Sequence, residues 1–425
     1  MAADTIYALS SGSPPAALAV VRISGARADY ALNALAGRLP EARRASLARL
    51  TWRGERLDDA LVLRFPGPAT ATGEDIAELH LHGGRAVVAA VLNALGDMEG
   101  LRLAEPGEFT RRAFENGRID LSEAEGLADL LQAETETQRR AALALAGGAL
   151  SRLVEGWQSR VLAQAAALEA VLDFSDEGEV GETMPPGWSE AVGELAGEME
   201  AALARPPAER LRDGLRVVIA GPPNAGKSSL LNWLAGRQAA ITSAIAGTTR
   251  DLVEAPTAIG GTPFLLVDTA GLRESGDEVE AIGVSRARET IASADLILWL
   301  GAPADGPDRA RTILIQSKAD LQPAGREADL RVSAETGEGM SALVDLLIAR
   351  AKLLLPAEGE AALNARHRGS IVAAAESLRE ARTSRDMLIS AECLRVARTS
   401  LDEVTGRGGV EQMLDALFGR FCIGK

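Results

Sequence analysis

Cysteine is scarce in this sequence, since Cys393 and Cys422 are the only two among 425 residues. So few cysteines exclude a disulfide framework and favour a reducing compartment. The first residues lack the basic start and the apolar stretch of a signal peptide. No uninterrupted apolar run approaches the roughly 18 residues that cross a bilayer. We therefore expect a cytoplasmic protein without a membrane span.

Positive charge and lysine are also scarce. The formal net charge of -15 argues against a protein that coats nucleic acid, although a local basic patch stays open. Arginine supplies almost all of the 45 basic residues, and only Lys227, Lys318, Lys352 and Lys425 are lysines. A compact ammonium suits a phosphate cradle better than a planar guanidinium does. Two of the four, Lys227 and Lys318, lie in nucleotide-binding motifs.

A phosphate-binding loop is the strongest motif. Residues 217–220 form a short apolar run that predicts a buried strand, and residues 221–228 spell GPPNAGKS, a full match to G-x-x-x-x-G-K-[ST]. An apolar helix follows, so a chance glycine turn is a poor explanation. Backbone N–H groups and the helix N-terminus favour phosphate there, Lys227 would reach the β- and γ-phosphates, and Ser228 would bind Mg²⁺. The loop contacts we predict are Asn224, Ala225, Gly226, Lys227, Ser228 and Ser229.

Four further motifs follow in the order expected of a GTPase. Residues 244–251 (AIAGTTRD) and 264–271 (FLLVDTAG) suit Mg²⁺ and the γ-phosphate, while residues 313–320 (ILIQSKAD) and 332–334 (VSA) suit guanine. Asp320 would accept two hydrogen bonds from the guanine edge, and Lys318 would lie over the ring. One phosphate loop fits an ATPase as well, but five ordered motifs predict a GTPase. The other predicted contacts are Ser243, Ala244, Ile245, Ala246, Gly247, Thr248, Thr249, Asp268, Thr269, Ala270, Gly271, Ser317, Lys318, Asp320, Ser333, Ala334 and Glu335.

The composition changes along the chain. Residues 1–118 alternate strand patterns (17–23, 60–65 and 75–82) with helical ones after Gly84 and Pro106, which predicts a mixed α+β domain. Residues 119–212 are rich in Ala, Leu and Glu at helical spacing, which predicts amphipathic helices with solvated acidic faces. We place the linker to the nucleotide domain at Pro206 and Pro207. The predicted segments are 1–118, 119–212, 213–354 and 355–425.

The segments NAGKSSLLN, AGTTRD and DTAGLR, with FTRRAFENGRIDLSEAEGLADL at 109–130 and the ending FCIGK, resemble the MnmE (TrmE) family of tRNA modification GTPases. The resemblance covers the whole chain and implies a multidomain fold. Its parts are an α+β folate-binding and dimerisation domain (1–118), an α-helical bundle built from 119–212 and 355–425, and an inserted α/β P-loop GTPase domain (213–354).

The resemblance also implies an activity and its partners. A K⁺-activated, Mg²⁺-dependent GTPase would form a homodimer and act with an FAD-containing MnmG-type protein, as a heterotetramer, on certain tRNAs. The pair would add a carboxymethylaminomethyl or aminomethyl group to C5 of the wobble uridine. The one-carbon unit would come from 5,10-methylene- or 5-formyl-tetrahydrofolate.

Site residues carry over by motif. The resemblance assigns K⁺ to Asn224, Ser243, Ile245 and Thr248, and Mg²⁺ to Ser228 and Thr249. Leu272 stands where Ras-type GTPases have a water-orienting glutamine, and the resemblance gives that role to Glu280. The implied catalytic set is Glu280, Lys227, Thr249 and Gly271. The implied folate ligands are Arg22, Glu78, Arg118 and Lys425, and Cys422 is either catalytic in the tRNA reaction or a small hydrophobic residue.

The sequence departs from the family pattern at several positions. Ser317 replaces the usual asparagine of the guanine motif, Arg118 replaces a lysine and Ser243 replaces a threonine. A shortened segment between Leu300 and Ile315 predicts that a connecting helix is trimmed or missing. Two other classes stay open: a translation- or ribosome-assembly GTPase, which should carry a basic RNA-binding module, and a nucleotide-gated scaffold with a vestigial folate site.

Overall fold

The structure is a computed structural model, and it describes residues 4–175, 184–236, 254–269, 288–321, 327–357, 359–408, 414, 417–419, 421, 423 and 424. Its internal contacts divide the chain into one unit of residues 1–128 with 405–425, and another of residues 129–404. No helix among the described residues is both long and apolar enough to cross a membrane.

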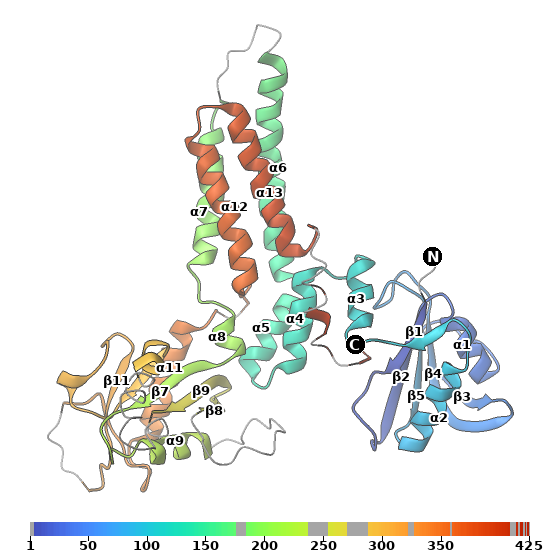
Figure 1. The fold of residues 1–425 in the computed structure, drawn as a ribbon, viewed down its shortest axis with the longest axis horizontal. Helices are drawn as coiled ribbons and strands as arrows, with labels where there is room; N and C mark the ends of the chain where they lie inside the picture. The colour runs from blue at the N-terminus through green and yellow to red at the C-terminus, as the bar shows by residue number, and fades with distance from the viewer. Residues whose placement is uncertain are drawn as a thin grey trace, which may run out of the picture. The chain divides into compact units, whose positions relative to one another are not determined.

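The first unit is built on a six-stranded sheet with the order β3-β4-β5-β2-β1-β6 (Figure 1). Neighbouring strands are antiparallel except β1 and β6, which are parallel. The elements are β1 (Thr5–Leu9), β2 (Leu18–Ser24), α1 (Ala28–Ala36), β3 (Ser46–Trp52), β4 (Glu55–Phe65), β5 (Ile76–His82), α2 (Arg85–Gly96), β6 (Leu101–Leu103) and α3 (Glu108–Glu115).

The two faces of this sheet have different roles. Alternate residues of a strand point to opposite faces, so the buried Val21 and Leu79 pack with α1 and α2 on one face. Arg22 and Glu78 therefore lie together on the other face, where they are register partners on β2 and β5. On that face Phe109 of α3 packs against β1. Arg22 and Glu78, which the resemblance names as folate ligands, thus lie on the face of the sheet that α3 packs against.

The C-terminal residues belong to the same unit. Phe418 packs against Phe114, with ring centroids 6.4 Å apart, and joins a small apolar cluster with Leu121 of α4 (Leu121–Gln132). Ile423 forms an isolated β-bridge with Pro106. Residues that are some 300 positions apart in sequence therefore share one core.

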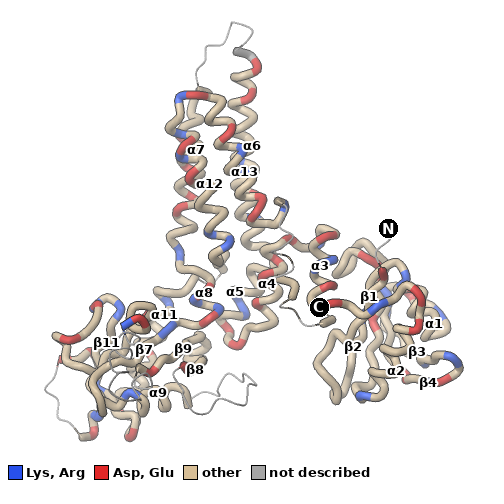
Figure 2. Tube along the Cα trace, in the orientation of Figure 1, with Lys and Arg blue, Asp and Glu red and all other residues tan. Residues whose placement is uncertain are grey.

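The second unit contains a bundle of four long helices, α6 and α7 with α12 and α13 (Figure 1). Each helix contributes an apolar face to one core, which contains Trp157, Met199, Leu378 and Leu401. The bounds of the helices of this region are α5 (Glu136–Ala146), α6 (Ala149–Ser175), α7 (Trp188–Leu203), α8 (Glu209–Arg212), α12 (Ala365–Thr383) and α13 (Met387–Thr405). Acidic residues follow the outer face of α7 (Figure 2), as amphipathic spacing predicts.

Between α8 and α12 the chain forms a second six-stranded sheet with the order β12-β11-β10-β7-β9-β8. All its neighbours are parallel except β8 and β9. The elements are β7 (Leu215–Ala220), α9 (Lys227–Gly236), β8 (Glu254–Ile259), β9 (Thr262–Asp268), β10 (Leu296–Trp299), β11 (Thr312–Gln316), β12 (Leu330–Arg331) and α11 (Met340–Leu354). Between β10 and β11 lies only a 3-10 turn, Pro303–Asp305, so the expected loss of a connecting helix is confirmed.

The central strand of this sheet carries the phosphate loop. β7 lies between β10 and β9 and is apolar along most of its length, because both faces of a parallel sheet are covered. The loops that follow β7, β9 and β11 therefore leave the sheet at the same edge, which is where ligands bind in open parallel sheets. An α/β P-loop domain inserted between helical segments was the predicted fold class, and it is confirmed.

Candidate functional site

The phosphate loop runs from the end of β7 to the start of α9. Gly221 has φ +150, and a Cβ there would lie 3.0 Å from the Cβ of Leu300. Gly226 has φ +88, and Asn224 has φ +59. These left-handed conformations curl the backbone around a space that faces the helix N-terminus. The two fixed glycines of the motif are thus required by backbone geometry and close packing.

Lys227 is buried beneath this loop, with 7% of its surface exposed. Its Nζ donates hydrogen bonds to the carbonyl oxygens of Gly221 (3.1 Å) and Pro222 (2.9 Å). The ammonium is therefore held at the loop by weak neutral acceptors, which the charged oxygens of a phosphate would replace with stronger bonds.

Ser228, one of the two predicted Mg²⁺ ligands, lies next to Asp268, which we expect to hold the ion through water; the other predicted ligand, Thr249, lies outside the described residues. Ser228 Oγ donates to Asp268 Oδ2 at 2.7 Å. Asp268 ends β9, the neighbour of β7, so the sheet brings it to the start of α9. A hydroxyl and a carboxylate at this spacing fit a hard cation that takes its other ligands from phosphate and water.

The guanine motif is tied directly to the phosphate loop. Ser317 Oγ donates to the carbonyl of Ala225 at 2.6 Å, and Lys318 Nζ donates to the carbonyl of Asn224 at 2.8 Å. Asp320 is exposed just beyond. Serine at position 317 therefore keeps the contact between the two loops, although its side chain is shorter than the usual asparagine.

The VSA segment offers a backbone amide to a base. The N–H of Val332 donates to Gln316 O and that of Ser333 to Glu338 O, each at 2.9 Å. Both amides are engaged inside the protein, which leaves the amide of Ala334 as the candidate for the guanine oxygen. Glu335 is exposed after it.

Changing Ser317 to asparagine should tighten GDP binding. Ser317 already bonds to Ala225, so the longer amide adds a contact to the base. We expect a gain of about 0.5–1.5 kcal/mol, the net contribution of one hydrogen bond. Ser317→Ala, which removes the bond to Ala225, should weaken GDP instead. Calorimetric titration checks both, and equal affinities of the three proteins would contradict this role.

The other predicted nucleotide contacts divide into two groups. Ser229 is exposed on α9, and buried Thr269 donates from Oγ1 to Ile219 O at 3.0 Å, so it braces the sheet. The predicted Glu280, Cys422 and Lys425 lie outside the described residues. The remaining predicted nucleotide contacts also lie outside them: Ser243, Ala244, Ile245, Ala246, Gly247, Thr248, Thr249, Ala270 and Gly271.

A cavity of about 440 Å³ lies on the charged face of the first sheet. Arg22, Thr72, Phe109 and Arg118 line it. Arg22 donates from Nε and Nη2 to Glu78 Oε1 at 3.0 and 2.8 Å, and both side chains are largely shielded from solvent. The structure thus brings predicted residues from β2, β5 and the end of α3 to one place.

The wall of this cavity is the loop of residues 70–74, which side chains hold from several directions. Arg118 Nε donates to Thr70 O at 3.1 Å, and Asn116 Nδ2 donates to Thr72 O at 2.7 Å. Ser24 Oγ donates to Glu74 Oε2, so the hydroxyl of Thr72, 2.7 Å from Ser24, is the donor to that serine. A fixed wall is what selective binding of a small molecule needs.

Arg112 anchors the same wall from α3. Its side chain is 8% exposed and donates to Glu74 (3.0 Å), Glu108 (3.3 Å) and the carbonyl of Asp4 (2.7 Å). Burial alone would raise the pKa of Glu108, but hydrogen bonds from Arg102 and the Glu105 N–H, with the charges of Arg102 and Arg112, hold it below its usual value. A lowered pKa stabilises the fold at neutral pH, and this contribution disappears as the pH falls through the acid range.

Replacing Arg112 with methionine should destabilise the first unit. The change leaves the mostly buried carboxylate of Glu74 without a guanidinium and leaves Glu108 paired with Arg102 alone. We expect a loss of about 2–4 kcal/mol, because Glu74 retains some contact with water. Urea denaturation followed by hydrogen exchange of β1–β6 measures it. The matched control is Arg139→Met, since the exposed Arg139–Glu136 pair should contribute little although it lowers the pKa of Glu136 to about 2. Equal effects of the two substitutions would contradict the anchoring role.

Gly424, near the C-terminus, packs against one of the residues that line this cavity. Gly424 has φ +98, and a Cβ there would lie 2.1 Å from Leu9 O and 3.0 Å from the Cα of Ser10. Ser10 lines the cavity. Gly424 therefore packs against a residue that lines the cavity, on a backbone path that a larger side chain could not follow.

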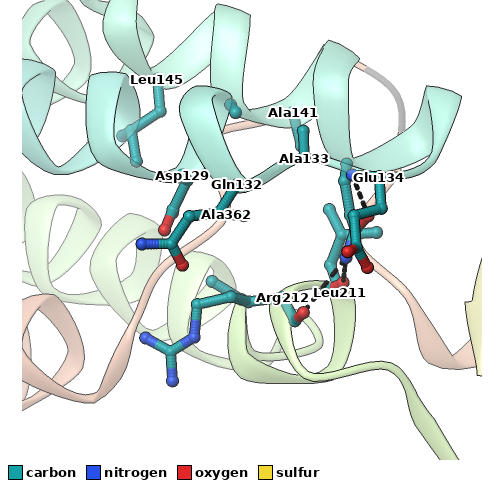
Figure 3. A pocket seen from close by; sticks show the side chains of 12 residues that line it. Asp129, Gln132, Ala133, Glu134, Ala141, Leu145, Leu211, Arg212 and Ala362 are labelled. Atoms are coloured by element: carbon teal, nitrogen blue, oxygen red, sulfur yellow. Dashed lines mark hydrogen bonds between the residues drawn. The ribbon is translucent and has the colours of Figure 1, made fainter. Parts of the chain in front are cut away.

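A second cavity, of about 390 Å³, lies in the other unit between α4, α5 and α8 (Figure 3). Asp129, Gln132 and Arg212 reach its edge, and none of the residues predicted for nucleotide or folate lines it. Beside it, Gln138 Nε2 donates to the carbonyls of Leu211 (3.2 Å) and Arg212 (3.1 Å). This cavity marks the place where the helical region meets the entry to the P-loop domain.

The junction continues onto the P-loop sheet itself. Thr137 Oγ1 on α5 donates to Gly261 O, in the turn between β8 and β9, at 2.9 Å. β9 runs from this turn to Asp268, which we expect to hold Mg²⁺ through water. One strand thus connects the phosphate site to the helical region.

Several residues that line or support the cavity were not predicted from the sequence. Ser10, Thr70 and Thr72 lie in loops without a motif, and Arg112 and Glu74 act through buried ion pairs that only the packing of α3 creates. Cys393 is also structural, since burial raises the pKa of its thiol within the bundle.

Comparisons with known proteins match this arrangement over the whole chain. The family model for the GTP-binding protein TrmE N-terminus matches residues 5–118, and that for the MnmE helical domain matches residues 121–422. The chain is 59% identical over 424 residues to the tRNA modification GTPase MnmE of Erythrobacter litoralis, covering 99% of this chain and 100% of that protein. It is 61% identical over 430 residues to the MnmE of Rhizorhabdus wittichii, covering 100% and 97%.

Among solved structures, the G domain of the FeoB iron transporter of T. maritima aligns with 32% of this chain and 98% of its own, at 22% identity and a TM-score of 0.24. The P-loop fold of residues 213–354 is therefore assigned from its own strand order and phosphate loop. The family assignment rests on two family models that together span residues 5–422 and on full-length relatives near 60% identity. This chain belongs to the MnmE family of tRNA modification GTPases.

Proposed function

We propose that this chain is a K⁺-activated GTPase that modifies C5 of the wobble uridine of certain tRNAs together with an FAD-containing partner, using a one-carbon tetrahydrofolate. Hydrolysis of GTP and a role in tRNA modification follow from the family and from the names of its relatives. The observation that carries the folate part is the convergence of Arg22 and Arg118 on one cavity, which Ser10, a neighbour of Gly424, also lines. We propose the segments 1–118, 119–212, 213–354 and 355–425 as its domains.

In GTP hydrolysis the protein mainly positions charge. Lys227 would exchange its two carbonyl partners for phosphate oxygens, and the loop amides would hold the β-phosphate. Ser228 and Thr249 would hold Mg²⁺, with Asp268 acting through water, and the ion would offset the negative charge of the phosphates. Asp320 would select guanine, because its carboxylate accepts two hydrogen bonds where the edge of adenine cannot donate both.

K⁺ would bind beside the phosphate loop at Asn224, with Ser243, Ile245 and Thr248, and would offset the charge that grows in the transition state. Asn224 is exposed, and its backbone carbonyl is held by Lys318, so its side chain is free to turn toward the nucleotide without moving the loop. Glu280 would orient the attacking water.

Turnover of GTP should therefore be much faster in KCl than in NaCl at equal ionic strength. Asn224→Ala should slow hydrolysis more than it weakens GDP binding, because the benefit of the ion is realised mostly in the transition state. Measured rates in both salts, with GDP affinities for both proteins, check the two statements. Identical rates in the two salts would remove K⁺ from the mechanism.

In the folate cavity, guanidinium groups would bind carboxylates of the ligand, as they do in bidentate pairs. Arg118 uses Nε for the cavity wall, and its Nη groups would bind the ligand. Glu78 fixes the orientation of Arg22 and would accept hydrogen bonds from the donor edge of the pterin. The folate would supply the one-carbon unit, and Lys425 would close the site from the chain end.

Calorimetric titration of the full chain with 5-formyl-tetrahydrofolate tests this function directly. Binding with one site per chain supports a one-carbon reaction in this protein. A chain that binds GDP but no reduced folate would instead be a GTPase switch of the translation or ribosome-assembly class. The proposed homodimer and its complex with the FAD-containing protein can be measured in the same preparations by light scattering.

A further inference from the structure

The hydroxyl of Ser10 is an unused polar group at the folate cavity. Its Oγ is shielded from solvent and has no hydrogen-bond partner among the described residues. Ser10 follows β1 directly, and its backbone N–H donates to Val20 O at 2.7 Å, so the residue is fixed in place by the sheet. A buried hydroxyl without a partner costs free energy, because it has given up its bonds to water.

The surroundings of Ser10 make it part of the binding site. It lines the same cavity as Arg22 and Arg118. The backbone of Gly424 packs against the Cα of Ser10, so the serine is enclosed between the cavity and the end of the chain. A serine hydroxyl has one donor and two acceptor positions and turns freely about its χ1 bond. Its Oγ is covered where it now lies, and one rotation about χ1 would bring it to the cavity surface, where a ligand could satisfy it.

The neighbouring serine shows the contrast. Ser11 Oγ accepts a hydrogen bond from the N–H of Val20 at 3.0 Å, and Ser11 does not line the cavity. Ser11 thus has a structural partner, and Ser10 has a place in a cavity but no partner. The adjacent serines thus differ: Ser11 has a structural role, and Ser10 has a place in the cavity.

We propose that the hydroxyl of Ser10 forms a hydrogen bond to the reduced folate and helps to determine which folate the site accepts. This inference rests on the proposed function, since it needs a folate in the cavity. It adds to that function a neutral polar contact from the residue that follows β1, beside the charged contacts of Arg22 and Arg118. The bond forms only in the complex, so Ser10 should lower the stability of the free protein while it raises the affinity of the ligand.

Because Ser10 should lower the stability of the free protein but raise the affinity for folate, measuring both quantities on the full chain tests the inference. Ser10→Ala should raise the Kd for 5-formyl-tetrahydrofolate about tenfold, and it should leave the thermal midpoint of the free protein unchanged or higher. Ser10→Cys, which keeps the volume but donates poorly, should raise the Kd to a similar extent. Ser11→Ala should show the reverse pattern, a lower thermal midpoint with the Kd unchanged.

The outcomes separate this inference from the proposed function. If the unchanged protein binds the folate and Ser10→Ala binds it equally well, the inference is wrong and the folate site stands. If Ser10→Ala weakens binding but Ser10→Cys does not, side-chain volume and not the hydrogen bond matters, and the inference is again wrong. If the unchanged protein binds no reduced folate, both the folate proposal and this inference fail.

Discussion

Replacing Arg22 with methionine should abolish wobble-uridine modification while GTP hydrolysis continues at its normal rate. Arg22 lines the cavity and is oriented by two hydrogen bonds to Glu78. Its loss removes a charged, bidentate donor to the ligand and leaves Glu78 without its guanidinium. Removing such a contact costs about 1.5–3 kcal/mol or more, so folate affinity should fall at least tenfold to a hundredfold. Nucleoside mass analysis and calorimetry measure the two effects.

Arg64→Met is the matched control for this substitution. Arg64 forms an equally shielded ion pair with Asp29 in the same unit, but it does not line the cavity. Both substitutions remove a guanidinium from a paired carboxylate, so both should reduce stability. Arg64→Met should nevertheless bind 5-formyl-tetrahydrofolate normally and support modification. Loss of modification in both variants would mean that Arg22 acts through the fold and not through the ligand.

Glu280→Ala should abolish rapid GTP hydrolysis, leave GTP binding nearly intact, and also abolish wobble-uridine modification. A residue that only orients the attacking water acts in the transition state, so its loss lowers the turnover rate and not the nucleotide affinity. We expect a decrease of at least a hundredfold. Single-turnover hydrolysis and nucleotide titration separate the two quantities.

The loss of modification in that variant would follow from coupling between the sites. The P-loop domain is joined at both ends to helical segments, and Thr137 of α5 bonds to the turn that leads through β9 to Asp268. Loops ordered by the γ-phosphate are a common switching element. In the proposed homodimer, the two P-loop domains would meet when GTP and K⁺ order the loop 243–249. Modification that continues at its normal level without hydrolysis would contradict this coupling.

The sequence predicted the parts of the fold that depend on local pattern. The strands ending at Ala220, Asp268 and Gln316 were predicted because buried parallel strands are continuous apolar runs. β1, β3, β6, β8 and β12 were not predicted. Edge strands such as β12 are short, and their pairing depends on neighbours that are distant in sequence.

The candidate sites show the same division. The spacing of the phosphate-loop motif predicted the roles of Lys227 and Ser228, because the strand, loop and helix of one segment determine where their side chains lie. The pairing of Ser228 with Asp268 needed the sheet. Arg22 and Glu78 were named from a family resemblance, and only the register of β2 against β5 shows why they form a pair. Buried residues such as Arg112 carry no local signal, since their partners lie on other elements.

The most direct measurement of the central claim is mass analysis of wobble uridines from cells that lack this protein, complemented with the unchanged chain, with Arg22→Met or with Glu280→Ala. We predict that the C5-modified nucleosides disappear without the protein, return with the unchanged chain, and stay absent with either variant. Unchanged levels of these nucleosides in cells without the protein would contradict the claim that this chain couples GTP hydrolysis to folate-dependent modification of tRNA.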